Sequence, residues 1–308
     1  MEDPTMNKRT AVYLLPLAGL MLTGCIRDRL PDCPPLSVTI DVKDKNYFNI
    51  NTISRLGLME AKAENLPFRE YVHSLYYEVT DEKGNIVARQ TTAAVDNDNA
   101  EQTLRLDTEL PYGKYKVSVW GNLNSDFPLD ENTPDDVLQS ADVMKTDVYI
   151  ASGTFDYRYG NENFKLSMER AKGNLLIRAE GLPDNIDFST KDISNVYSLV
   201  GHNLSYSKPA TMHTATEWLE PNRIQTQTLL CPSTSFEAST LSVTFADKST
   251  VQQSDADTNM LQPDDVRITM GRNEVTVLKY VYDQNTESFT IYAIVNDNWE
   301  VVHGMEIE

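Results

Sequence analysis

The stretch LPYGKYKVSVWG, residues 110–121, decides the fold of this chain. Pro111 and Gly113 predict a turn, because proline presets one backbone angle and glycine tolerates the others. After the turn, apolar and polar residues alternate, which places every second side chain on the same face of a strand. The apolar members of this alternation are Tyr115, Val117 and Val119. We therefore predict a half-buried β-strand, entered through a tight turn.

The same alternation recurs on both sides of this stretch. Residues 36–42 (LSVTIDV) alternate without a break and predict a first strand, and Tyr71 to Val79 predict a second. The turn residues of 81–85 (DEKGN), followed by Ile86, predict a β-hairpin. Further strands are predicted at 104–106, 148–150, 164–168, 175–177, 196–200, 226–230, 241–245, 266–270, 275–282 and 289–295. Only short helices are expected, within residues 44–66 and after Thr133-Pro134.

Short strands at this spacing predict an all-β protein, and a chain of this length exceeds one ordinary core. We expect two β-sandwich domains, spanning residues 36–160 and 161–308, with the boundary in the loop Gly160-Asn161-Glu162-Asn163. A Pro and Gly turn that leads into an aromatic strand is typical of transthyretin-like and immunoglobulin-like sandwiches.

The N-terminus has the order of an export signal. Lys8 and Arg9 precede the apolar run 11–22, which is too short for a membrane span of roughly 20 residues. The run ends in Leu22-Thr23-Gly24-Cys25, which resembles the lipobox of bacterial lipoproteins. That resemblance implies that residues 1–24 are a signal peptide cut between Gly24 and Cys25, and that the Cys25 thiol carries acyl chains such as palmitate. A plain secretory signal with an incidental Cys25 is the alternative, and translation could start at Met1 or at Met6.

Residues 25–35 would follow as a tether, because Pro31, Pro34 and Pro35 oppose helix and central strand. The chain carries a formal net charge of −19, which repels nucleic acid and excludes it as a partner. Besides Cys25 there are two cysteines, Cys33 and Cys231, in a chain that we expect to be exported. They could form one disulfide, or they could remain separate thiols.

No pattern in the chain predicts catalysis or a cofactor. The four histidines, His73, His202, His213 and His303, have no metal-ligand spacing. Asp96 to Asn99 and Asp255 to Asn259 resemble the opening of calcium loops but lack the required glycine and the final glutamate, so solvated turns are favoured. Nucleophile-elbow, phosphate-loop and dinucleotide motifs are absent from the sequence. Trp120, Trp218 and Trp299 could line a sugar platform, although packing at strand ends is the commoner role for Trp120 and Trp299.

Several segments, taken in order, resemble the FimB-type fimbrial anchor subunits of the Bacteroidales. The matching pieces are the lipobox with Cys25, the opening 32–38 (DCPPLSV), residues 68–72 (FREYV) with the hairpin at 81–87, the turn 110–115 (LPYGKY) with the strand end 119–122 (VWGN), the junction 164–171 (FKLSMERA), and the last strands 289–295 and 298–301. The resemblance covers nearly all of residues 25–308.

The resemblance implies two transthyretin-like sandwiches and no catalysis. It implies an outer-membrane lipoprotein, held by lipid on Cys25 and exposed at the cell surface, that tethers a fimbrium and limits its length. Its partners would be the membrane and a fimbrial shaft subunit, and we expect no cofactor and no bound metal. A lipid-anchored glycan-binding protein of a nutrient-uptake system is the alternative, and a lipoprotein hydrolase is the least favoured hypothesis. A further hypothesis is that residues 299–307 are lent to a shaft subunit as a strand, the alternative being an ordinary closing strand.

Overall fold

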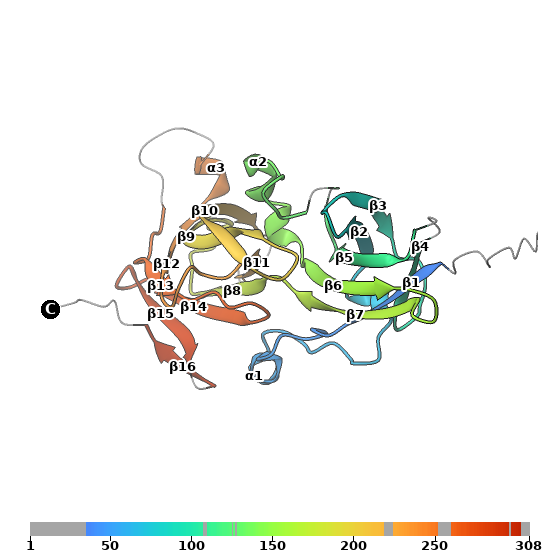
Figure 1. Ribbon diagram of the computed structural model, residues 1–308. Helices are drawn as coiled ribbons and strands as arrows, with labels where there is room; N and C mark the ends of the chain where they lie inside the picture. Colours follow the sequence, from blue (N-terminus) through green and yellow to red (C-terminus); the bar gives the residue numbers. More distant parts are fainter. Residues whose placement is uncertain are drawn as a thin grey trace, which may run out of the picture. The chain divides into compact units, whose positions relative to one another are not determined.

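The structure is a computed structural model that describes residues 35–106, 110–124, 126, 128–218, 224–251, 260–295 and 297–302. Residues 35–308 fall in one compact unit. Figure 1 shows that strands dominate the described part, with a few short helices between them. No described helix is both long and apolar enough to cross a bilayer.

The first half of the chain forms seven strands with short helical turns between them. The strands are β1 (Leu36–Val42), β2 (Ser74–Asp81), β3 (Ile86–Ala94), β4 (Gln102–Leu106), β5 (Gly113–Gly121), β6 (Tyr149–Tyr157) and β7 (Asn163–Arg170). The helical turns are α1 (Ile50–Arg55), η1 (Phe68–Glu70), α2 (Asp135–Leu138) and η2 (Val143–Lys145).

The second half forms nine strands and one helical turn. The strands are β8 (Gly173–Glu180), β9 (Phe188–Val200), β10 (Tyr206–Glu217), β11 (Ile224–Leu230), β12 (Ser239–Ala246), β13 (Val266–Ile268), β14 (Val275–Asp283), β15 (Ser288–Val295) and β16 (Asn298–Val301). The helical turn is α3 (Lys248–Val251).

The two halves repeat one topology. In the first half, β3-β2-β5-β6 and β7-β1-β4 lie in order, and in the second half β10-β9-β12-β13 and β14-β8-β11 follow the same order. Each half contains one parallel pair, β1 with β7 and β8 with β14, whereas the other pairings are antiparallel. The second half then adds β15 and β16 beyond β14. The chain is therefore a duplicated seven-strand sandwich with a C-terminal hairpin.

The first sandwich differs from the second in how its two layers meet. Its layers are joined at one corner, where β6 and β7 pair at Tyr149 with Arg170 and at Ile150 with Glu169. This short pairing makes all seven strands one continuous sheet that folds over on itself. Among the described residues, β13 and β14 do not pair in this way, so the second sandwich stays open at the equivalent corner.

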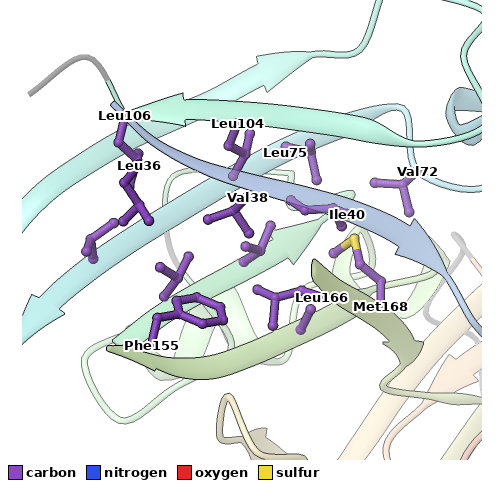
Figure 2. Close-up of a cluster of buried hydrophobic side chains, with 14 of the residues drawn as sticks. Leu36, Val38, Ile40, Val72, Leu75, Leu104, Leu106, Phe155, Leu166 and Met168 are labelled. Atoms are coloured by element: carbon purple, nitrogen blue, oxygen red, sulfur yellow. The ribbon is translucent and has the colours of Figure 1, made fainter. Parts of the chain in front are cut away.

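The core of the first sandwich follows from the alternation of β1. Leu36, Val38 and Ile40 point inward and are at most 1% exposed, while Ser37, Thr39 and Asp41 are half-buried on the other face. Figure 2 shows these three side chains among apolar residues of other segments, and the labelled neighbours are Val72, Leu75, Leu104, Leu106, Phe155, Leu166 and Met168. Since β1 is hydrogen-bonded on both sides, to β4 and to β7, it is a central strand of its layer.

The motif at residues 110–122 fixes both ends of strand β5 within the first sandwich. The Tyr115 hydroxyl donates to the carbonyl of Pro111 over 2.7 Å, which fixes the turn that starts β5. At the other end of the strand, a Cβ on Gly121 would lie 2.6 Å from Val72, so only glycine fits there. Asn122 has a φ of 63° and its buried amide donates to the carbonyls of Tyr71 and Asp147. These residues hold three segments of the first sandwich together.

The predicted all-β fold with two sandwiches is confirmed, and most predicted strands are present within a few residues. The predicted boundary at residue 160 needs a correction at the level of the sheets. Strand β7 was assigned to the second sandwich, yet it pairs with β1 along residues 163–168. Gly160, with a φ of +78°, forms the tip of the β6–β7 hairpin, and the change of sandwich falls between Arg170 and Gly173.

Strand β10 was missed in the sequence. Pro209 stands in its interior and the register shifts between Ala210 and Met212, which breaks the alternation. Proline is tolerated because β10 is an edge strand, with β9 as its neighbour in the sheet.

Candidate functional site

The predicted lipidation and cleavage residues, Cys25 and Gly24, lie outside the described residues, as does Cys33. Cys231 is described, buried and free of any disulfide to another described residue. Burial raises the pKa of the Cys231 thiol to about 11, so it is a protonated, unreactive thiol at neutral pH. Both alternatives for Cys33 and Cys231, one disulfide or two separate thiols, stay predictions.

The two sandwiches meet at a buried arginine, Arg170, from the end of β7. Its side chain is 3% exposed and its Nε donates to both carboxylate oxygens of Asp147, over 2.9 and 3.0 Å. Its guanidinium lies 4.1 Å from the ring centroid of Tyr47 and also donates to Tyr149 and to Asn273. Burial lowers the pKa of Arg170, but the charge of Asp147, the neighbouring Tyr149 and Tyr47 and the hydrogen bond to Asp147 together outweigh this, so the net pKa is raised. The group is a permanent cation that joins both halves, because Asn273 belongs to the second.

A second arginine, Arg272, approaches the same place from the second sandwich. Its Nη1 lies 2.7 Å from Asp44 and its Nη2 lies 3.1 Å from Glu169. Asp44 also accepts the backbone N–H of Arg170 over 2.9 Å. The Glu169-Arg170 pair, singled out in the sequence for its resemblance, thus lies at the centre of an ionic junction between the sandwiches.

Residues 43–66, which we name the strap, reach from the first sandwich onto the second. Asn49 exchanges two hydrogen bonds with the backbone of Val275, at 2.8 and 3.0 Å, much as a neighbouring strand would. Arg55 lies 3.1 Å from Asp297. The apolar cluster between the strap and β8 and β14 comprises Tyr47, Ile50, Ile53, Leu58, Leu176, Val275 and Val277. The strap therefore covers an outer face of the second sandwich.

A separate apolar cluster joins the sandwiches through the β5–β6 connection and the β9–β10 hairpin. Its buried members are Tyr76, Trp120, Leu123, Leu129, Leu138, Val148, Ile150, Ala171, Val200 and Cys231. The Val200 N–H donates to the Leu129 carbonyl over 2.8 Å, and the Tyr206 hydroxyl donates to the Ala171 carbonyl over 2.6 Å. With the arginine junction and the strap, this cluster makes the two sandwiches one connected body.

Two lysines are buried, one in this cluster and one in the second sandwich. The Lys172 ammonium donates to the carbonyls of Val143 and Thr146, over 2.5 and 3.3 Å, and Lys191 donates to the hydroxyl of Thr226 over 2.9 Å. Burial lowers the pKa of each lysine to about 8. Neither was singled out in the sequence, where an isolated lysine in a strand carries no signal of burial.

An open groove of about 430 Å³ lies in the second sandwich, between the edge strand β13 and the C-terminal hairpin. Its lining residues are Glu237, Thr240, Asp265, Val266, Arg267, Ala293, Val295, Glu300, Val301 and Val302. Val295 and Val301 are 41% and 42% exposed, and Phe236, next to Glu237, is 79% exposed. Strands β13 and β16 are both last in their sheets as described, so one edge of each has no described strand as its partner.

The remaining candidates from the sequence are placed as follows. No group of described residues has the arrangement of a metal site. The 96–99 segment is a polar turn in which Asp98 pairs with Arg69, and the 255–259 segment lies outside the described residues. His213 pairs with Asp192 over 2.8 Å, His202 contacts Lys116, His73 is exposed, and His303 lies outside the described part.

The three tryptophans pack at separate places instead of forming a platform. Trp120 is 4% exposed in the cluster between the sandwiches. The Trp218 indole N–H donates to the Ile186 carbonyl over 3.0 Å, and the Trp299 ring lies 4.8 Å from the Lys279 ammonium.

The fold defines a class of protein, the all-β double sandwich. Its distinctive features are the ionic junction between the two sandwiches and the edge strands beside the groove. No protein-family model matches the chain, and no curated protein matches it in sequence. Solved structures match it in fold.

The matching structures include three proteins from Bacteroides and Porphyromonas species. A Bacteroides thetaiotaomicron protein described as polysaccharide-binding has a TM-score of 0.53 and 12% identity, over 88% of this chain and 98% of that chain. The fimbrial anchor protein Mfa2 from Porphyromonas gingivalis has a TM-score of 0.50 and 12% identity, over 87% of this chain and 100% of that chain. A Bacteroides ovatus protein described as an adhesin has a TM-score of 0.50 and 15% identity, over 91% and 98%.

At such identities the likeness establishes a shared fold. The resemblance to fimbrial anchor subunits, stated from the sequence, is thereby confirmed at the level of the fold. The match includes both sandwiches, because it spans nearly the whole of each chain.

Proposed function

We propose that this protein is a non-catalytic lipoprotein that anchors a fimbrium to the outer membrane and limits its length. The observation that carries the proposal is the path of the chain: β1, the central strand of a layer, begins at Leu36, eleven residues after Cys25. The shared fold with a fimbrial anchor protein supports the same role. The proposal includes both the lipid on Cys25 and the limit on the length of the fimbrium.

An anchor must pass force from lipid to fimbrium without unfolding, and the first sandwich is suited to that. A pull through the tether acts on β1 at Leu36, while the resistance enters through β7 at Arg170, which leads to the second sandwich. The two strands are parallel, so these points lie at opposite ends of the pair. The force then shears the inter-strand hydrogen bonds together instead of peeling them one by one.

The junction passes the force onward. The strap connects the end of β1 to the second sandwich within a few residues, through Asn49 and Val275. Arg170 and Arg272 tie the end of β7 to the same region. We propose that the fimbrial shaft is held by the second sandwich, at the groove between β13 and β16, which combines edge strands with exposed valines.

A pair of variants tests the groove. Val295→Glu together with Val301→Glu places charges on its apolar wall, and both positions are exposed enough to leave the fold intact. Val251→Glu, at 46% exposure in the same sandwich but outside the groove, is the matched control. We expect shaft subunits to co-purify with the wild type and the control but not with the double variant. Equal co-purification in all three would remove the groove from the proposal.

Strand β16 reduces the number of residues in the segment 299–307 that could be donated to a shaft subunit. Residues Asn298–Val301 pair with β15, as an ordinary closing strand does. Donation could then involve only residues 303–308, which lie outside the described part. Deleting those six residues leaves β16 complete, and detached fimbriae on a folded, lipidated protein would support donation.

Glycan binding is the second candidate, favoured by the likeness to a protein described as polysaccharide-binding. The tryptophans give it little support, because each packs against protein groups. A panel of polysaccharides tested against the wild type and Trp218→Ala separates the two functions. Binding that is lost in the variant would favour the glycan role.

A further inference from the structure

One end of the first sandwich bears exposed apolar and aromatic side chains. Tyr159 is 77% exposed, Ile86 is 48% exposed and Tyr112 is 44% exposed. The ring of Tyr112 packs edge-on against Tyr157, with 5.1 Å between ring centroids, so this tyrosine is held in place by the fold. We name Ile86, Tyr112 and Tyr159 the tyrosine tip.

The strand register places the three residues at the same end of one layer. Tyr112 precedes Gly113, the first residue of β5, which pairs with Tyr157 at the end of β6. Tyr159 follows two residues later in the β6–β7 hairpin. Ile86 opens β3 after the turn from β2, whose last residue, Asp81, pairs with Tyr115. The register pairs Ile86 with Thr80, which lies level with Lys116 and Thr154, so Ile86 stands about four residues along the strands from Tyr112 and five from Tyr159. With a strand spacing of about 4.8 Å and a rise of about 3.3 Å per residue, the three residues lie within roughly 20 Å of one another.

The chain enters the fold at this same end. The Ser37 N–H donates over 2.9 Å to the carbonyl of Glu162, in the hairpin that carries Tyr159. Ser37 is also the register partner of Asn163, the first residue of β7. Figure 1 shows the start of β1 beside the loop between β6 and β7. The ten tether residues 26–35 span at most about 35 Å when fully extended, which bounds how far this end can lie from Cys25.

The chemistry of the tip suits the border between lipid and water. Tyrosine combines an apolar ring with a hydroxyl that seeks water, and it is enriched where membranes meet water. The charged side chains around the tip are mixed in sign, with Lys83, Lys114 and Arg158 beside Glu82, Asp156 and Glu162. Such a surface has no strong preference for anionic headgroups, so a zwitterionic bilayer is the surface that it fits.

We propose that the tyrosine tip rests in the headgroup region of the membrane that holds the lipid on Cys25. The proposal rests on the lipid anchor of the proposed function. The tether then limits the distance between the membrane and the first sandwich, and contact of the tyrosine tip with the membrane fixes the orientation of that sandwich. Contact of the tip with the bilayer orients the layers of that sandwich with their strands rising from the membrane, which is the direction of pull through β1.

Spin-label accessibility tests this contact in the full-length, mature lipoprotein, reconstituted in phosphatidylcholine vesicles. In a Cys33→Ser background, a nitroxide is attached at Tyr159→Cys or at Phe236→Cys. Phe236, 79% exposed in the second sandwich, matches Tyr159 in exposure. We expect the label at position 159 to lose most of its collisions with an aqueous nickel complex and to gain collisions with oxygen. The label at position 236 should remain fully aqueous. Adding Ile86→Ser and Tyr112→Ser should return the label at 159 to the aqueous pattern.

Sedimentation of the same vesicles separates failure of the tip from failure of the anchor. Protein that sediments with the vesicles but shows equal nickel accessibility at both positions overturns the tip contact and leaves the lipid anchor standing. Protein that carries no lipid and stays in the supernatant overturns the anchor and, with it, the inference. Protection at 159 that persists in the serine variant also overturns the role given to these side chains.

Discussion

The first and second sandwiches share their strand order, yet their edges differ. In the first, β6 and β7 pair at a corner and close the layers into one sheet. In the second, the matching strands β13 and β14 do not pair among the described residues, and a hairpin is added beyond β14. The closed copy receives the tether, and the open copy carries a groove between edge strands.

Under the proposed function, this difference divides two tasks between the copies of a duplicated fold through their edges. At the corner where β6 and β7 pair, no strand can be added, which suits a domain that must only transmit force. At the matching corner of the second sandwich, β13 is an edge strand, and an edge strand offers backbone N–H and C=O groups to a partner strand. This suits a domain that must bind a fimbrial subunit. The junction between the copies is therefore the place where the two tasks are coupled, and its disruption should have the largest effect.

Arg170→Met should break the coupling of the two copies. It leaves the Asp147 carboxylate and the Tyr149 hydroxyl without their buried cation, so we expect the free energy of unfolding to fall by about 3–5 kcal/mol. Arg178→Met is the control, because its ion pair with Glu180 is 43% exposed on the arginine side and should cost less than about 1 kcal/mol. Urea titration measures both. Equal losses in the two variants would contradict the importance of the junction.

A matched pair of core variants tests whether the copies unfold together. Ile40 in β1 and Ile177 in β8 are buried on the central strands, opposite Leu166 and Leu278 on the parallel neighbours. Ile40→Ala and Ile177→Ala should each cost about 3 kcal/mol. Because the clusters and the strap join the copies, we expect one calorimetric transition that both variants lower alike. Two transitions, each moved by one variant only, would show independent domains.

The buried lysines predict a rise of stability with pH. Their pKa is about 8 in the folded chain and near 10.5 when exposed, so below pH 8 both states bind the proton equally. Between pH 8 and 10 the unfolded chain binds more protons, and the free energy of unfolding should rise by roughly 1 kcal/mol per pH unit for each lysine. Lys172→Met and Lys191→Met should each flatten this slope. A slope that is unchanged in both variants would contradict the low pKa values.

The cysteines provide the smallest test. β1 runs from Leu36 toward the junction over about 20 Å, and three residues from Cys33 to Leu36 span at most about 11 Å. Cys231 packs at the junction, so the pair should stay further apart than the ~7 Å that a disulfide allows. We expect two free thiols in the native protein by mass spectrometry after alkylation. A peptide linking Cys33 to Cys231 would contradict this.

The sequence predicted the parts of the fold that local alternation controls. Residues 36–42 predicted β1 to the residue, and the turn at 81–85 predicted the β2–β3 hairpin. The parallel pairing of β1 with β7 joins residues more than a hundred positions apart, and no local pattern announces it, so the boundary was placed before β7 instead of after it. The repeat was missed for the same reason, because it is a repeat of strand order.

The site was predictable only in part. The Glu169-Arg170 motif drew attention in the sequence, but its role depends on Asp147, Asn273 and the strap, which come from distant segments. The groove and the tyrosine tip likewise form where separate loops meet. Cys25 lies outside the described residues, and its lipidation stays a prediction that rests on contiguous residues alone, because a lipobox is recognised in an unfolded chain.

Fimbriation of cells that carry Cys25→Ser tests the central claim most directly. The variant leaves both sandwiches unchanged and removes only the thiol that we propose as the acceptor of lipid. Electron microscopy of cells and of the culture medium, with this protein followed by immunoblot, gives the readout. The account predicts that fimbriae and the variant protein leave the cells and are recovered together from the medium. Fimbriae that remain on the cells in normal number and length would contradict it.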